Sequence, residues 1–311
     1  MNLLNNFHEY YDKKMKAYEK LYTQKRYHYK QREEEKVFIS LLVIVIALAI
    51  MCFWRGAIPF MVCVIILNIL FSVFNWSNNQ KDYIEGIKKE VIFPAIIACF
   101  SEYRYSTAGV SESIYRESNM YYSYDKFSSS NMIKGMIDGR ELILSEVGLK
   151  EEAEAFGRNM GYETSFEGTF LKLEANYFVG NPIYIEPIVK SKVITSATVV
   201  LEKAFGLTKS TVKFDTPDFE RFFEVFSQDH EEARRVLTPN FLELLLELRN
   251  RYNAKIYCTF KENNVYMLIS NLKIVDVEDV YAKGLSKGTL YGNLKIIQDI
   301  VDVAELIANK K

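Results

Sequence analysis

The pattern of apolar and polar positions separates a charge-free section near the N-terminus from a longer section of mixed elements. Residues 37–54 contain no charged side chain, and a second charge-free run follows Arg55 over residues 56–76. A helix needs about 20 mostly apolar residues to cross the hydrocarbon core of a bilayer. A buried helix of a soluble protein normally keeps a polar stripe, which these runs lack. The pattern therefore predicts two transmembrane helices, at residues 37–54 and 58–76.

The link between these two runs is short, so the helices are expected to form an antiparallel hairpin. Pro59 suits the first turn of the second helix, and Trp54 and Trp76 fall at span ends, where indole rings are favoured. The outer ends of the hairpin are basic, whereas the turn contains only Arg55. The basic residues are Lys20, Lys25, Arg26, Lys30, Arg32 and Lys36 before the first span, and Lys81, Lys88 and Lys89 after the second. The positive-inside rule then places both termini in the cytoplasm, as in a two-span membrane protein. A cleavable signal peptide is not expected, because a long polar segment precedes the first run and no small-residue cleavage site ends it.

Asn68 is the strongly polar residue near the middle of the second span. Folding the hairpin about Gly56 places Asn68 opposite Ile44, which cannot bond to it, and Ser72 opposite Ser40. One hypothesis is that Asn68 bonds to a second copy of the hairpin and makes an oligomer contact. The other is that it bonds to a nearby backbone carbonyl or faces a small polar gap.

Residues 1–36 are predicted to form one polar helix that runs into the first span. Apolar and aromatic residues recur on it at spacings of three and four, which places them on one face. They are Leu4, Phe7, Tyr11, Met15, Tyr18, Tyr22 and Tyr29. Such a face needs a partner, either the soluble domain or another chain, so we expect a protein partner or a homo-oligomer through this helix or through the hairpin.

The remaining sequence predicts an α+β domain with a mixed sheet and several packed helices. An amphipathic helix is expected at 81–100, followed by connecting structure at 103–130 with a short helix near 111–118. Asp138-Gly139 predicts a hairpin turn between strands 131–137 and 140–146. Further strands are predicted at 164–177, 182–187, 194–201 and 211–214, and a second hairpin at 255–260 and 265–270.

Two helices of this section share a start signal. Thr216-Pro217 and Thr238-Pro239 each offer a capping hydroxyl followed by proline at the first helical position. The first helix would present Phe219, Phe222, Phe223 and Phe226 on one face, and the second Phe241, Leu242, Leu245 and Leu248. A final amphipathic helix is expected at 290–308. The predicted domains are thus a polar helix at 1–36, a transmembrane hairpin at 37–76 and a cytoplasmic α+β domain at 77–311.

Composition narrows the function classes. The 311 residues carry 39 basic and 40 acidic side chains, a net charge of −1, which argues against a nucleic-acid binder. Of the four cysteines, Cys52 and Cys63 fall in the spans, while Cys99 and Cys258 are isolated in sequence. That usage fits a reducing cytoplasm.

No sequence motif indicates a reaction, so an enzyme is the less favoured class. His230 stands among acids, at residues 229–232, but successive residues of a helix point in different directions and cannot all bind one metal ion. Gly284, Gly288 and Gly292 lie near two lysines, yet their spacing matches no phosphate-binding loop. We therefore expect no metal and no cofactor.

Several short segments, in this order, resemble the bacterial family called domain of unknown function 3137. They are SEV at 145–147, TSFEGTF at 164–170, FDTPDFE at 214–220, FEVF at 223–226 and ARRVLTP at 233–239. The hairpin before the domain is also similar, and the resemblance covers roughly residues 37–270. It implies an inner-membrane protein with a cytoplasmic domain, and it brings no reaction and no site residues.

Two functions remain open. The first is a membrane-anchored binding or scaffolding module with the lipid bilayer as one partner. The alternative is a membrane-tethered enzyme in which acids such as Glu146 and Glu167 line a cleft in the sheet. A channel is disfavoured, because two uncharged spans offer no ion path unless several copies assemble.

Overall fold

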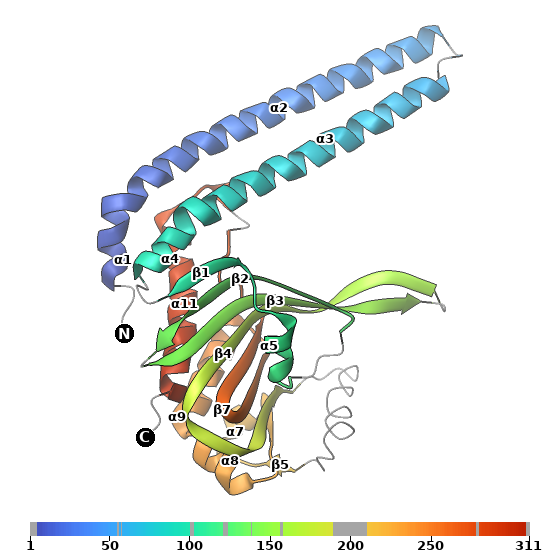
Figure 1. Ribbon diagram of the computed structural model, residues 1–311. Coiled ribbons are helices and arrows are strands. Elements are labelled where there is room, and N and C mark those ends of the chain that lie inside the picture. Colours follow the sequence, from blue (N-terminus) through green and yellow to red (C-terminus); the bar gives the residue numbers. More distant parts are fainter. Residues whose placement is uncertain are drawn as a thin grey trace. The chain divides into compact units, whose positions relative to one another are not determined.

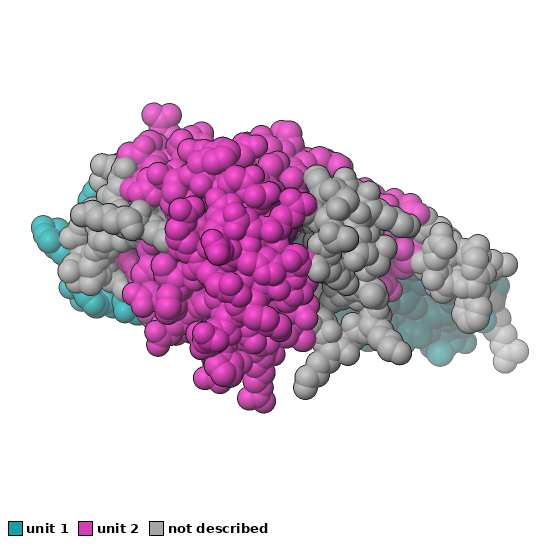
Figure 2. Space-filling model, turned by 90° about the horizontal axis from the view of Figure 1, so that it is seen from below, with its two compact units in different colours: residues 1–99, 275–294 teal, residues 100–274, 295–311 magenta. Residues whose placement is uncertain are grey.

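The computed structural model describes most of the chain (Figure 1), which divides into two compact units (Figure 2). The described residues are 5–54, 56, 58–99, 103–120, 124–137, 139–155, 158–188, 210–277 and 280–308. The first unit comprises residues 1–99 and 275–294, and the second comprises residues 100–274 and 295–311. Helix α11 (Lys287–Ala308) contributes to both. The domain boundaries predicted at residues 36 and 76 stay a prediction.

The first unit is helical. It contains α1 (Asn5–Tyr10), a π-helical turn (Tyr11–Met15), α2 (Lys16–Phe53), α3 (Ile58–Ile87), a second π-helical turn (Lys88–Ile92), α4 (Phe93–Cys99) and α10 (Val280–Lys283). The helices α2 and α3 run side by side (Figure 1). The predicted long N-terminal helix that continues into the first apolar run is confirmed.

Among the residues that the structure describes, one helix is long and apolar enough to cross a membrane. It extends over Phe7–Phe53, 47 residues, and its apolar part is almost entirely exposed. The apolar part of α3 that meets the same criteria of composition is shorter, Ile58–Val73. The N-terminal apolar helix is therefore a candidate membrane anchor, while the two-span arrangement stays a prediction.

The aromatic face of the N-terminal helix finds its partner inside the first unit. Phe7, Tyr11, Met15 and Tyr22 are all buried. The Phe7 ring lies 5.9 Å from the ring of Tyr291, and the Tyr22 ring lies 5.8 Å from that of Tyr83. These four members of the predicted face pack against their own chain, whereas Tyr18 is exposed and Leu4 lies outside the described residues. A protein partner through this helix stays a prediction.

The second unit is an α+β fold built on a seven-stranded sheet (Figure 1). The strands run in the order β1 (Arg104–Ala108), β2 (Lys126–Ile137), β3 (Arg140–Ala155), β4 (Arg158–Pro187), β6 (Phe223–Phe226) and β5 (Thr211–Val212), and β7 (Ile256–Ser270) also pairs with β4. Every described pairing is antiparallel. The α+β class is confirmed and the mixed sheet is wrong, because hairpins rather than crossover helices join the long strands.

Two breaks predicted within strands do not exist. β4 continues over 30 residues through Gly180-Asn181, and β7 continues through residues 262–264 instead of turning back. Both halves of β7 pair with β4, with irregular register between Glu174 and Ile183. Gly180-Asn181 and residues 262–264 suggested turns because they are turn-forming residues. In the structure β4 and β7 pair with each other on both sides of these residues, which therefore form bulges. Glu262, with φ of 54°, marks one of them.

The hairpin predicted at Asp138-Gly139 is confirmed by the pairing of Ile137 with Arg140 and by a φ of 78° at Gly139. The predicted strand at 194–201 lies outside the described residues. The segment 103–130, expected to be connecting structure, contains β1, the start of β2 and α5 (Glu112–Glu117). The short helix expected there is confirmed.

The two threonine–proline signals have different outcomes. α9 (Pro239–Tyr252) begins as predicted, with the Thr238 hydroxyl accepting a hydrogen bond from the Phe241 amide. The other helix, α7 (Pro217–Glu220), ends after one turn, and β6 comes next. The predicted helix through Phe226 is wrong, because Phe223 and Val225 are both buried at a spacing of two. A short apolar run can fit both the helical period of 3.6 residues and the strand period of two. Pairing with β4 stabilises the strand in this segment.

Opposite faces of the sheet carry different covers. On one face a buried cluster gathers around Tyr115 of α5, with Val147, Phe166, Phe170 and Leu268 among its members. On the other face α9 contributes Phe241, whose ring meets that of Phe260 on β7 at 5.6 Å. The short helix α8 (His230–Val236) precedes α9. Part of the face opposite to the Tyr115 cluster, over β2, β3 and β4, remains accessible to solvent.

Candidate polar cleft on the sheet

The open part of the sheet is a polar patch created by strand register. In the pairing of β2, β3 and β4, Ser130 lies opposite Glu146, and Gly148 lies opposite both Ser128 and Glu167. Opposite residues of antiparallel strands share a face, and alternate residues of one strand do too. Serine, glutamate and glycine therefore gather on one face. The intervening residues Val147 and Leu149 point into the buried cluster on the other face.

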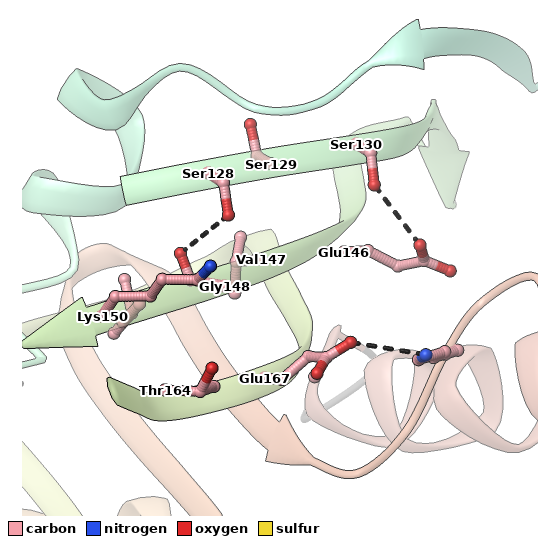
Figure 3. Close-up of a pocket in the computed structure, with 12 residues that line it drawn as sticks. Ser128, Ser129, Ser130, Glu146, Val147, Gly148, Lys150, Thr164 and Glu167 are labelled. Atoms are coloured by element: carbon pink, nitrogen blue, oxygen red, sulfur yellow. Dashed lines mark hydrogen bonds and ion pairs between the residues drawn. The ribbon is translucent and has the colours of Figure 1, made fainter. Parts of the chain in front are cut away.

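This patch is hollowed into a cleft of about 390 Å³ (Figure 3). Its lining residues are Ser128, Ser129, Ser130, Glu146, Val147, Gly148, Leu149, Lys150, Thr164, Glu167, Gly168 and Lys273. Glu146 from β3 and Glu167 from β4 both reach into it (Figure 3). The structure thus brings together the two acids that the sequence singled out.

Gly148 keeps the centre of the cleft open. A Cβ atom at this position would lie 2.8 Å from the hydroxyl oxygen of Ser128. The Ser128 hydroxyl uses the space to donate a hydrogen bond to the Gly148 carbonyl oxygen at 3.1 Å. A side chain here would displace Ser128 and fill the floor between the two glutamates.

Glu146 is positioned by an unusual backbone residue of β2. Asn131 interrupts the β2–β3 register and has a φ of 51°, in the left-handed region that asparagine tolerates. Its amide NH₂ group donates to the Glu146 carboxylate, and its amide oxygen accepts from the Tyr105 hydroxyl at 2.7 Å. The Ser130 hydroxyl donates to the same carboxylate at 3.4 Å. This bulge therefore aims one glutamate into the cleft.

Glu167 is positioned by the segment that comes directly after β7. Lys273 lies 3.3 Å from the Glu167 carboxylate. Two bonds hold the segment: the Asn271 amide donates to the Glu167 carbonyl at 2.9 Å, and the Thr169 hydroxyl donates to the Leu272 carbonyl at 2.8 Å. The ammonium group of Lys273 thus lies beside the Glu167 carboxylate at the rim of the cleft.

Sequence patterns could not identify the remaining members of the cleft. The three serines are ordinary residues of an exposed strand, and Lys273 joins them only through the pairing of β7 with β4. Asn131 offers no sequence signal, because the register shift that turns its amide toward Glu146 depends on the partner strand.

The acidic group around His230 is dispersed, as expected. Asp229 accepts a hydrogen bond from the Glu232 amide and caps α8. The Glu232 carboxylate accepts from the amides of Gly180 and Asn181 at 3.1 and 3.2 Å, and the His230 ring bonds to the Ser210 hydroxyl. In the described part of the chain, no group of three or more histidine, cysteine, aspartate or glutamate residues could hold a metal ion.

The other candidates have structural roles. Gly284 has a φ of 95° just after α10, while Gly288 and Gly292 lie within α11. Cys258 is buried, and burial raises the pKa of its thiol. It is therefore unreactive, as its position on an apolar strand face predicts.

Asn68 bonds within the helix pair. Its side-chain oxygen accepts a hydrogen bond from the Ser40 hydroxyl of α2. The register inferred by folding about Gly56 is wrong, because Ser40 faces Asn68 rather than Ser72. Contact of Asn68 with a second copy stays a prediction.

Comparison with known proteins supports the family resemblance. Residues 164–308 match the family described as protein of unknown function DUF3137. The matched segment contains Glu167 and Lys273 of the cleft but begins after Glu146. A search of the curated proteins finds no match. Among solved structures, the mycobacterial trehalose monomycolate transport factor A, TtfA, aligns with 65% of this chain and 86% of its own, at 8% identity and a TM-score of 0.33. Similarity at this level supports no statement about function.

Proposed function

Residues 164–308 match the DUF3137 family, and from this premise we propose that the protein is a membrane-anchored binding module of the bacterial inner membrane. In this proposal the N-terminal apolar helices form a two-span anchor with both termini in the cytoplasm. The second unit presents the polar cleft to a cytosolic ligand.

The cleft is the observation that carries the binding role. An exposed sheet face normally carries scattered polar residues, whereas here two glutamates, two lysines and the hydroxyl groups of Ser128, Ser130 and Thr164 line one hollow. The charges of Glu146 and Glu167 balance those of Lys150 and Lys273. A ligand that carries both an ammonium and an anionic group would meet complementary partners at this site.

Free amino acids and short peptides are suitable probes, because they carry both groups. We expect isothermal titration of the detergent-purified protein to detect saturable binding of a subset of them. Glu167→Gln removes one charged partner and should weaken that binding about tenfold or more. Glu163→Gln is the matched control, because Glu163 is an exposed residue of the same strand that does not line the cleft. Equal affinity of the Glu167→Gln protein and the wild type would contradict a binding role for the cleft.

The second candidate function is a membrane-tethered enzyme, favoured by the presence of two carboxylates in one cleft. Paired carboxylates serve as general acid and base in many hydrolytic sites. In this structure, however, the Glu146 carboxylate accepts a hydrogen bond from Asn131, and the Glu167 carboxylate forms an ion pair with Lys273. This arrangement also suits binding without reaction. Mass spectrometry of a bound probe after long incubation separates the two functions. A chemically changed probe with the wild type, but not with Glu146→Gln, would establish the enzyme.

A further inference from the structure

The first unit contains a cavity of its own, between the parts of α2 and α3 that adjoin the apolar runs. Its volume is about 520 Å³. The lining residues are Tyr22, Lys25, His28, Tyr29 and Arg32 of α2, and Asp82, Tyr83, Gly86 and Glu90 of α3 and the π-helical turn after it. We call it the juxtamembrane cavity.

The inner end of the juxtamembrane cavity is closed by bonded groups. The Tyr22 hydroxyl donates to the Glu90 carboxylate at 2.7 Å, and the Lys25 ammonium lies 3.4 Å from the same group. The buried Tyr83 contacts Tyr22 and Tyr29, ring edge to ring face, with centroids 5.8 Å apart in each pair. This end is therefore an aromatic wall with a neutralised carboxylate.

The outer end carries charges without partners. Within the described part of the chain, the side chains of Arg32 and Asp82 make no hydrogen bond and no ion pair, although both residues line the cavity. The positive charges of Lys25 and Arg32 equal in number the negative charges of Asp82 and Glu90. The cavity therefore offers both positive and negative groups rather than a basic patch. Gly86 contributes to the opening, because its missing side chain leaves the Tyr22 hydroxyl as the nearest neighbour, 3.3 Å from a Cβ atom.

The position along the helices indicates what can reach this end. Arg32 precedes the start of the apolar run at Val37 by five residues, or about 7 Å of helix. Asp82 lies six residues, or about 9 Å, beyond the end of the second run at Trp76. The headgroup layer extends roughly 5 to 7 Å beyond each side of the hydrocarbon core. If the apolar runs span the membrane, the outer end opens at the outer edge of the headgroup layer, where the long side chain of Arg32 can reach lipid phosphates.

We propose that the juxtamembrane cavity binds the headgroup of a zwitterionic phospholipid of the ethanolamine type. The phosphodiester accepts hydrogen bonds from Arg32, and the ammonium group binds Asp82 beside the ring of Tyr29. Arginine matches phosphate geometry through paired donors, and an ammonium near an aromatic ring gains a cation–π contact. This inference rests on the membrane anchor of the proposed function and is independent of the polar cleft.

Lipid retention tests the proposal. The full chain is reconstituted in nanodiscs of mixed phosphatidylethanolamine and phosphatidylglycerol, transferred to mild detergent and analysed by native mass spectrometry. We expect the wild type to retain phosphatidylethanolamine preferentially. Arg32→Gln should reduce its retention about tenfold, since a hydrogen-bonded charge is lost. Gly86→Leu should block the cavity without changing charge.

Lys36→Gln is the matched control. Lys36 is an exposed basic residue one turn closer to the apolar run, and it does not line the cavity. A general attraction between basic residues and the membrane would make Lys36→Gln at least as damaging as Arg32→Gln, and that result would overturn the proposal. Preference for phosphatidylglycerol would overturn it as well. Displacement of the lipid by an equal concentration of soluble glycerophosphoethanolamine would assign the site to a soluble ligand and overturn the lipid assignment.

Two further measurements keep the outcome unambiguous. Thermal unfolding checks that the Gly86→Leu protein remains folded. If that variant does not fold, the lipid retention of the Arg32→Gln protein decides the test, because Arg32 is an exposed residue. Carbonate extraction of native membranes tests the anchor separately. Extraction of the wild type would overturn the anchor and this inference together. Resistance to extraction without selective lipid retention would overturn this inference alone.

Discussion

At the scale of single residues, Asn131 determines where Glu146 points. The left-handed backbone conformation turns its amide group toward the carboxylate, and the Tyr105 hydroxyl fixes which end of the amide faces Glu146. Asparagine suits this position because it combines tolerance of a positive φ with one donor end and one acceptor end. The bulge and the glutamate therefore work as one unit of the polar cleft.

Asn131→Asp tests this unit. Aspartate keeps the shape and the tolerance of positive φ, but it replaces the donor with a second carboxylate against Glu146. We expect the free energy of unfolding at neutral pH to fall by about 1–3 kcal/mol. The loss should shrink as the pH falls, because protonation of one acid restores a donor. Urea unfolding at pH 7 and pH 5 measures both effects. Asn119→Asp, at another asparagine with positive φ, is the control and should change stability little.

At the scale of elements, the two threonine–proline signals show how far local sequence decides structure. The Thr238 hydroxyl caps α9, whereas the Thr216 hydroxyl is buried and has no hydrogen-bond partner among the described residues. The same two residues thus begin a 14-residue helix at one place and a single turn at the other. The difference lies in the next segment of the chain, since β4 offers an edge to residues 223–226.

Substituting valine for each threonine separates the two roles. Thr238→Val removes a helix cap and should lower the free energy of unfolding by about 1 kcal/mol. Thr216→Val removes a buried hydroxyl without a partner, so it should leave stability unchanged or raise it by up to about 1 kcal/mol. Paired thermal unfolding curves compare the variants directly. Equal destabilisation by both substitutions would show that Thr216 also caps its helix.

A second element-scale feature joins α9 to α11 within the second unit. The buried Asp299 carboxylate lies 2.6 Å from the Arg251 guanidinium and accepts a hydrogen bond from the Tyr252 hydroxyl, also at 2.6 Å. Burial alone would raise the pKa of Asp299, but the bonds from Tyr252 and Arg251 and the charges of Arg251 and Lys295 lower it below its usual value near 3.8. The folded state therefore favours the ionised carboxylate.

This pKa shift predicts the direction of a pH dependence. Because the pKa of Asp299 is lower in the folded state, its contribution to stability is complete above about pH 4 and is lost as the pH falls through the folded value. Asp299→Asn should lower the free energy of unfolding at pH 7 by about 1–3 kcal/mol. The lower part of that range applies if solvent around the partly exposed Arg251 weakens the ion pair. Tyr252→Phe, which removes one donor and leaves the charges, should cost less. Unfolding measured between pH 7 and pH 3 should show a weaker acid dependence for Asp299→Asn than for the wild type.

At the scale of the whole molecule, the apolar helices argue for a membrane anchor. Their exposed surface includes Leu42, Ile46, Leu67 and Phe71. Such a surface would promote aggregation in water, whereas lipid would cover it. In the proposed function, the lipid bilayer covers this surface.

Charges placed on that surface test the anchor. Each arginine near the middle of a span costs about 2.5–3.5 kcal/mol for membrane insertion. We expect Leu42→Arg combined with Leu67→Arg to shift the protein from the carbonate-resistant membrane fraction to the soluble or aggregated fraction. Tyr27→Arg, at an exposed position outside the apolar run, should leave the wild-type distribution unchanged.

Much of this architecture could be predicted from local patterns, and the failures share one physical cause. Spacing identified the buried face of Phe7, Tyr11 and Tyr22, the turn at Gly139 and the cap at Thr238. It failed where a distant strand decides the outcome, as in the continuous β7 and the short α7. The cleft shows the same division. Glu146 and Glu167 could be selected as acids on predicted strands, but Asn131 and Lys273 reach them only through long-range register.

The packing of the N-terminal helix also determines when this part of the protein can finish folding during synthesis. The Arg26 guanidinium donates to the carbonyl groups of Tyr281 and Ala282, which lie about 255 residues later in the chain. At roughly 5–20 residues per second, a ribosome needs about 13–50 s to make that length of chain. During this interval the apolar helices have already emerged, while the aromatic face of the N-terminal helix lacks the part of its cover that includes Tyr281 and Tyr291. A nascent chain stalled before residue 275 would therefore keep that part of the face exposed.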